Sequence, residues 1–157
     1  MSEIARIGSQ LKRASEGGAW HGPSLLELLA DVTAEQAASR PLAGAHSIWE
    51  IVLHIKAWQD FATRALAGEP MPTNLPDEED WPPVLDAGRE AWRAAVANVG
   101  EANKRLRDAM RKLSDDDLER IVGGREYNVY FLLHGIVQHG LYHAGQIALQ
   151  KKALAQT

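Results

Sequence analysis

Four long stretches of this chain carry apolar residues at steps of three and four, and no stretch of similar length alternates apolar with polar residues. Such spacing puts the apolar residues on one face of an α-helix. The stretches run from about Ile4 to Ala14, from Ser47 to about Ala67, from near Pro83 to about Lys112, and from about Val129 to Ala153. Amphipathic helices without a sheet can bury their apolar faces only against one another, so the sequence predicts an all-α four-helix bundle.

Local signals mark the connections between these helices. Ser47 and Glu50 in "SIWE" have the spacing of a capping box, and so do Thr33 and Gln36. Short helical patterns lie around Thr33 and in "LSDDDLERI", so we expect short extra helical pieces in the connections. Residues 69–83 contain five prolines and the acidic run "DEED", which favours a solvated surface loop.

Composition narrows the class of protein. The length of 157 residues and the 45% hydrophobic content suit one domain over residues 1–157. A net charge of -4 without a basic cluster argues against nucleic acid and an anionic membrane as partners. No segment approaches the roughly 20 apolar residues of a membrane span, and we expect a cytoplasmic protein. Because the chain has no cysteine, any metal site must use nitrogen and oxygen ligands.

Two histidines lie on the buried face of the last long helix. At about 100° per residue from Ile136, His143 falls at about -20° and His139 at about -60°, one turn apart and within the apolar arc. On the second long helix, His54 lies inside the apolar arc beside Trp58. The two helices are therefore expected to direct three imidazoles into the core.

Three converging imidazoles indicate a metal site. A buried neutral imidazole needs a partner for each ring nitrogen, and a shared divalent ion can take a lone pair from all three. Two histidines at i and i+4 plus a third from a facing helix leave one coordination position open for water or substrate. Neutral nitrogen ligands suit zinc, nickel, cobalt, copper or iron, with zinc and nickel as the first candidates. The spacing also leaves a second interpretation open, in which each histidine is a core residue bonded to a backbone carbonyl.

Other side chains near these histidines are candidates for the surroundings of the site. Gln146 falls at about -80° on the last helix, so it can hydrogen-bond a ligand imidazole or line a cavity. Tyr142 and Trp58 are candidate pocket residues, although aromatic residues at helical spacing also serve as core. Glu50 is better explained by its capping box, and His46 by a local role in the loop before that cap.

Two stretches carry a family resemblance. They are "HSIWEIVLHIKAWQDFATRALAG" and, some 80 residues on, "IVQHGLYHAGQIALQKKAL", whose H-x-x-Y-H-x-G-Q-I pattern is close to a signature. Together they resemble the DinB/YfiT-like superfamily of metalloenzymes, and the resemblance covers nearly the whole chain. It implies an up-up-down-down bundle whose metal is held by one histidine of the second long helix and two of the fourth, which correspond to His54, His139 and His143.

The resemblance also implies a range of functions. Similar proteins often form homodimers, and some are transferases or isomerases that use a low-molecular-weight thiol such as bacillithiol or mycothiol. This chain has no obvious extra C-terminal domain like that of the thiol-dependent isomerases, which argues against that specific activity. We therefore expect a metal-dependent thiol transferase acting on a small molecule. A metal-dependent hydrolase and a non-catalytic metal-binding stress-response module are the alternatives.

Overall fold

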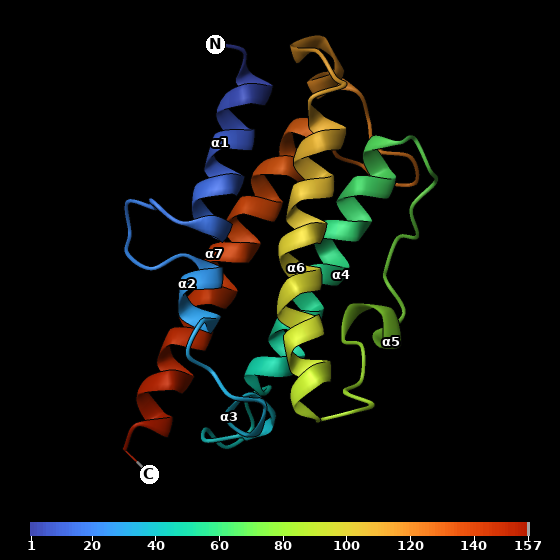
Figure 1. Ribbon diagram of the computed structural model, residues 1–157. Coiled ribbons are helices and arrows are strands. Elements are labelled where there is room, and N and C mark those ends of the chain that lie inside the picture. The colour runs from blue at the N-terminus through green and yellow to red at the C-terminus, as the bar shows by residue number, and fades with distance from the viewer. Residues whose placement is uncertain (157) are drawn as a thin grey trace.

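Helices make up most of the computed structural model, which describes residues 1–156. The four long helices pack side by side (Figure 1); they are α1 (Glu3–Glu16), α4 (Ile48–Leu66), α6 (Arg89–Met110) and α7 (Val129–Leu154). Shorter pieces lie in the connections: α2 (Leu25–Leu29), α3 (Ala34–Ala38), α5 (Asp77–Asp80) and the 3-10 helix η1 (Asp115–Glu119). The described residues form no β-strand, only one isolated bridge. The predicted helical class, with extra pieces in the connections, is confirmed.

The directions of the long helices differ from the prediction. α1 and α7 run one way, and α4 and α6 run the other way (Figure 1). Side-chain contacts agree, because Trp49 packs on Trp92 near the starts of α4 and α6, and Asp60 pairs with Arg105 nearer their ends. The order along the chain is therefore down, up, up, down, and the up-up-down-down prediction was wrong.

The long connection between α4 and α6 explains this order. Residues 67–88 return along the length of the bundle, so that α6 starts beside the start of α4 and the two helices are parallel (Figure 1). The third long helix was expected from near Pro83, but α6 begins only at Arg89. Gly88 precedes it in an extended conformation and donates its backbone N–H to Asp86 Oδ1 at 2.7 Å. The non-helical connection before α6 therefore continues beyond Pro83, as far as Gly88.

The start of α4 is fixed by the predicted cap. Ser47 Oγ accepts from the backbone N–H of Glu50 at 3.2 Å, and Glu50 Oε2 accepts from that of Ser47 at 2.7 Å. This reciprocal pair satisfies two amides that a helix start leaves free. It also fixes the register of α4 and hence the face on which His54 emerges.

Two apolar clusters form the core. One joins α1, α4, α6 and α7 around side chains such as Leu106 and Leu133, and the other joins α2, α3, α4, α6 and α7 around Ile55 and Ile147. The stretch of α7 between the two clusters carries His139 and His143. No helix within residues 1–156 has an apolar stretch long enough to cross a membrane.

Candidate metal centre

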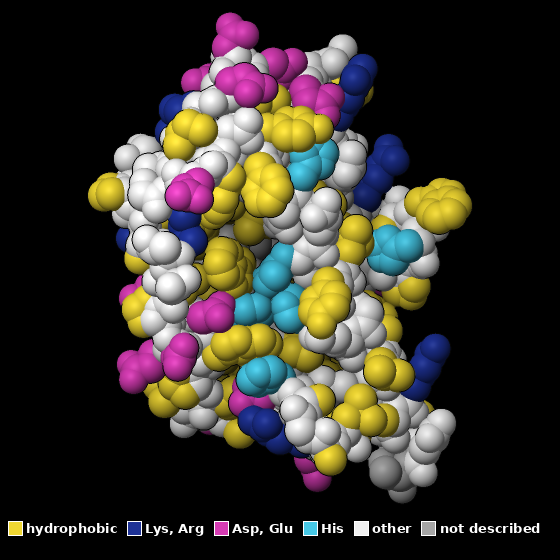
Figure 2. All heavy atoms as spheres, turned by 180° about the vertical axis from the view of Figure 1, so that it is seen from behind, with side chains coloured by type: hydrophobic (Ala, Val, Ile, Leu, Met, Phe, Trp, Pro, Cys, Tyr) yellow, Lys and Arg dark blue, Asp and Glu magenta, His cyan; other side chains and the backbone are white. Residues whose placement is uncertain are grey.

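The three predicted histidines meet between α4 and α7. Each of these histidines, His54, His139 and His143, offers one ring nitrogen as a possible ligand, and the three nitrogens all lie within 4.8 Å of one another. The closest pair is Nε2 of His54 and Nε2 of His139, at 2.9 Å. His54 and His143 are each only 5% exposed. Figure 2 shows histidine side chains gathered in a hollow of the face opposite to that of Figure 1, with hydrophobic side chains around them.

Hydrogen bonds orient two of these rings. His54 Nδ1 donates to the backbone carbonyl oxygen of Asp80 at 2.6 Å, and His143 Nδ1 donates to Gln146 Oε1 at 2.7 Å. A nitrogen that donates carries the ring proton, so the other nitrogen of each neutral imidazole keeps a lone pair. Nε2 of both rings is therefore available as a metal ligand. Gln146, a candidate from the sequence, holds one of these rings.

The surroundings favour neutral rings. Burial lowers the pKa of His139 to about 3, and repulsion from the neighbouring rings of His143 and His54 adds to the effect. Burial is also the main cause that lowers the pKa values of His54 and His143. Only a deprotonated ring nitrogen can bind a metal, so the protein holds all three imidazoles in the form that a metal requires.

The donor set fits a divalent cation. Two neutral imidazoles whose nitrogens lie 2.9 Å apart need a proton or a cation between their lone pairs. Three nitrogen atoms from two helices match the three protein ligands of an open tetrahedral site. Among the described residues, this group contains three histidines and no Asp or Glu. A tetrahedral ion held by these three nitrogens would have one coordination position left for a molecule from solution.

The acidic run "DEED" does more than the solvated loop that the sequence analysis assigned to it. It forms α5, and Asp80 at its end is only partly exposed. In addition to its carbonyl contact with His54, Asp80 accepts through Oδ1 from Trp58 Nε1 at 2.7 Å. The next residue, Trp81, stacks on the His54 ring with centroids 3.8 Å apart and planes 4° apart. Residues 80 and 81 therefore fix the ring of His54, a role that the sequence pattern did not indicate.

His46 also has more than the local role expected from its position. Its ring stacks on the second face of Trp81 with centroids 3.6 Å apart, so that an indole lies between two imidazoles. Its Nδ1 lies 3.6 Å from Glu50 Oε2. The sequence held little signal for this arrangement, because a loop far along the chain supplies the tryptophan that connects the two histidines.

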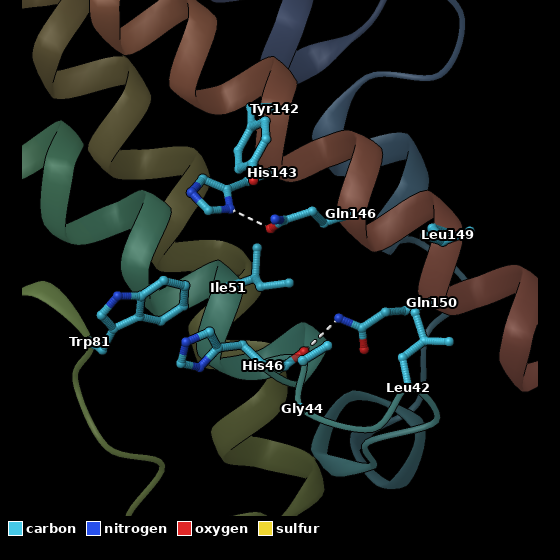
Figure 3. Close-up of a pocket in the computed structure, with 11 residues that line it drawn as sticks. Leu42, Gly44, His46, Ile51, Trp81, Tyr142, His143, Gln146, Leu149 and Gln150 are labelled. Carbon is cyan, nitrogen blue, oxygen red and sulfur yellow. Dashed lines mark hydrogen bonds between the residues drawn. The ribbon is translucent and has the colours of Figure 1, made fainter.

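Two cavities adjoin the three histidines, one toward each end of the bundle. The larger cavity, of about 430 Å³, is called the polar cavity because His46, His143, Gln146 and Gln150 line it, although Trp81, Tyr142, Leu42, Ile51 and Leu149 also give it much apolar lining. Figure 3 shows Trp81 and His46 on one side of it and the α7 residues Gln146 and Gln150 on the other. The aromatic cavity, of about 200 Å³, is lined by His139, Trp58, Tyr127, Phe131, Leu132 and Ile136, with Gly135 between them. Each cavity thus reaches a different histidine of the group.

Fold and site together define a helical bundle with three buried histidines that could hold a metal ion. A comparison with protein families matches residues 19–147 to the DinB superfamily, a stretch that includes all three histidines. The chain belongs to the DinB superfamily, as the two quoted sequence stretches predicted. A comparison with curated proteins and one with solved structures each found no match.

Proposed function

We propose that this protein is a metal-dependent transferase that joins a low-molecular-weight thiol to a small electrophile. The observation that supports the proposal most directly is the position of the three imidazoles between two cavities. His143 borders the polar cavity and His139 borders the aromatic cavity, so two reactants can approach one centre from different sides. A chain without cysteine also needs its sulfur nucleophile from outside.

His54, His139 and His143 would hold the ion, with zinc or nickel as the candidates. When bound, the ion supplies Lewis acidity that lowers the pKa of a thiol or water molecule in the open position. In the transfer, the S–H bond breaks, sulfur forms a bond to the electrophilic carbon, and the displaced group leaves with its bonding pair and takes up the proton.

The chain's own contribution is orientation and the exclusion of water. The Asp80 carbonyl and the Gln146 carboxamide fix the rings of His54 and His143. Trp81 covers one face of His54 and keeps water from it. These contacts hold the nitrogens in place before any reactant arrives, which reduces the reorganisation that binding requires.

A metal-dependent hydrolase is the second candidate. The polar cavity favours it, because Gln146 and His46 can hydrogen-bond water beside His143. A non-catalytic metal-binding module is less well supported, since a purely structural site closes with a fourth protein ligand. The described residues supply three histidines to the group and no fourth ligand.

Metal analysis of the protein, purified without a histidine tag, tests the centre. We expect about one metal ion per chain, and its loss in His54→Ala, since two ligands on one helix hold a metal weakly. His21→Ala is the matched control, because His21 is exposed and lies outside the group. Unchanged metal content in His54→Ala would remove this residue from the site.

Activity assays then separate the two reactions. The metal-loaded protein is incubated with a small electrophile and N-acetylcysteamine, and separately with small esters and amides. We expect a thioether product that forms in wild type and not in His54→Ala. Hydrolysis without thiol conjugation would favour the second candidate.

We extend the proposal to a homodimer. α7 carries exposed apolar side chains, among them Leu141 and Leu149, which are 36% and 57% exposed. Its apolar residues are thus not confined to the face that packs in the bundle, and a second copy would cover part of them. Sedimentation equilibrium should give twice the chain mass of 17.3 kDa, and a monomer mass would refute the dimer.

A further inference from the structure

The aromatic cavity has the chemistry of a binding site for an uncharged ring. Its walls are the side chains of Trp58, Tyr127 and Phe131 together with aliphatic carbon, and its lining contains no Asp, Glu, Lys or Arg. The indole of Trp58 lies 5.8 Å from the imidazole of His139, measured between ring centroids. An apolar group in this cavity therefore ends next to the metal centre.

A glycine leaves this cavity open. Gly135 lies on α7 one turn before His139 and borders the cavity. Apart from its two neighbours in the chain and the backbone of its own helix, no heavy atom lies within 4 Å of the place where a Cβ on Gly135 would sit. Glycine in a helix interior is unfavourable relative to residues with a side chain, and this one has no positive φ that would require it. Here glycine provides space that any larger residue would occupy.

The volume of the cavity limits the size of its ligand. An enclosed apolar cavity of about 150 Å³ is known to hold benzene; the aromatic cavity, of about 200 Å³, is open to solvent at Phe131, which is 63% exposed, and has room within it for one ring. The polar cavity on the other side of the histidines offers Gln146, Gln150 and His46 instead. The two cavities therefore select for different chemistry.

We propose that the aromatic cavity binds the uncharged aromatic part of the substrate and places its reactive carbon beside His139. This inference rests on the proposed function, and it assigns the electrophile to the aromatic cavity and the thiol to the polar one. The substrate class is then a small electrophile built on a single ring.

Two hydroxamic acids test the position of the ring. The full-length zinc-loaded protein is titrated calorimetrically with acetohydroxamic acid and with phenylacetohydroxamic acid, which share the metal-binding group and differ in the phenyl ring. Burial of a ring tightens binding on the order of tenfold or more, so we expect the phenyl compound to bind at least about tenfold more tightly to wild type.

The variant Gly135→Leu should remove this preference by filling the cavity. Binding of acetohydroxamic acid and the zinc content should stay close to those of wild type, since no side-chain atom of the three histidines lies within 4 Å of a Cβ at residue 135. Gly145→Leu is the matched control on the same helix, because Gly145 also has open space at its Cβ and borders neither cavity. A preference for the phenyl compound that persists in Gly135→Leu would overturn the proposal.

Ligand binding in the aromatic cavity can also be tested without a metal. The ¹⁹F NMR signal of 4-fluorobenzyl alcohol should shift and broaden with metal-free wild type and with Gly145→Leu, and remain unchanged with Gly135→Leu. The same response from all three proteins would overturn the proposal. Failure of the wild type to bind zinc would instead refute the proposed function, so the two failures are distinguishable.

Discussion

Replacing His139 by glutamine should flatten the pH dependence of the stability of the metal-free protein. Burial, with repulsion from His143 and His54, lowers the pKa of His139 from 6.5 to about 3. The folded protein therefore keeps this imidazole neutral at pH values at which the unfolded chain protonates it. Because the unfolded chain binds more protons below pH 6.5, the free energy of unfolding falls with falling pH. This contribution to stability is complete above pH 6.5 and is lost progressively toward pH 3.

The size of the effect follows from the lowered pKa. Within this window, each pH unit lowers the free energy of unfolding by about 1.4 kcal/mol for one proton. A change from pH 6.5 to pH 5 therefore removes about 2 kcal/mol through His139 alone. The pKa values of His54 and His143 are lowered too, so wild type should lose more than this amount. Glutamine does not titrate, and the variant should lose correspondingly less.

Urea unfolding followed by tryptophan fluorescence measures this difference. The titrations are run with a chelator at several pH values between 5 and 7.5, and the chain's five tryptophans provide the signal. His21→Gln is the control, because this exposed histidine should leave the wild-type pH dependence intact. Equal pH dependence in wild type and His139→Gln would refute the reasoning, since it would mean that the buried ring titrates as freely as an exposed one.

Two further substitutions test contacts around the site and in the core. Asp80→Ala should weaken metal binding about tenfold or more, measured by competition with a chelator. In this variant Trp58 loses its hydrogen-bond acceptor, and the segment that orients His54 loses its contact with α4. Asp77→Ala is the control, because Asp77 is exposed on α5, and it should bind metal like wild type. Glu16→Ala should lower the free energy of unfolding, measured in urea, by about 1–3 kcal/mol. The reason is that Arg107, which is only 8% exposed, would lose its carboxylate partner. A loss below about 0.5 kcal/mol would contradict a stabilising role for this ion pair.

The parts of the fold that local signals determine could be predicted from the sequence. α4 and α7 begin and end within a residue or two of their predicted bounds, because apolar periodicity and the box at Ser47 act within a few residues. The start of α6 was placed too early, since Pro83 is compatible with a first helical turn but the chain stays extended up to Gly88. The directions of the helices depend on the path of residues 67–88, which no local pattern specifies.

In the site, too, local sequence patterns predict some residues, and others depend on the path of a long connection. The three histidines could be found on helical wheels, because each lies on the inward face of a regular helix whose register the sequence fixes. Asp80 and Trp81 could not be found in this way. The contact between Asp80 and His54 spans 26 residues and depends on the course of an irregular segment. His46 was missed for the same reason, since Trp81 is what connects it to the centre.

The stacked rings of His46, Trp81 and His54 limit how the sequence of this protein can change during evolution. One face of the indole supports His54 and the other supports His46, and the indole itself lines the polar cavity together with His46. A mutation at Trp81 therefore changes the lining of the polar cavity and the support of His54 together, so these two properties cannot evolve independently there. At Gly135, by contrast, a Cβ would lie more than 4 Å from the side chains of the three histidines, so under the proposed function natural variation in substrate preference should accumulate first at that position.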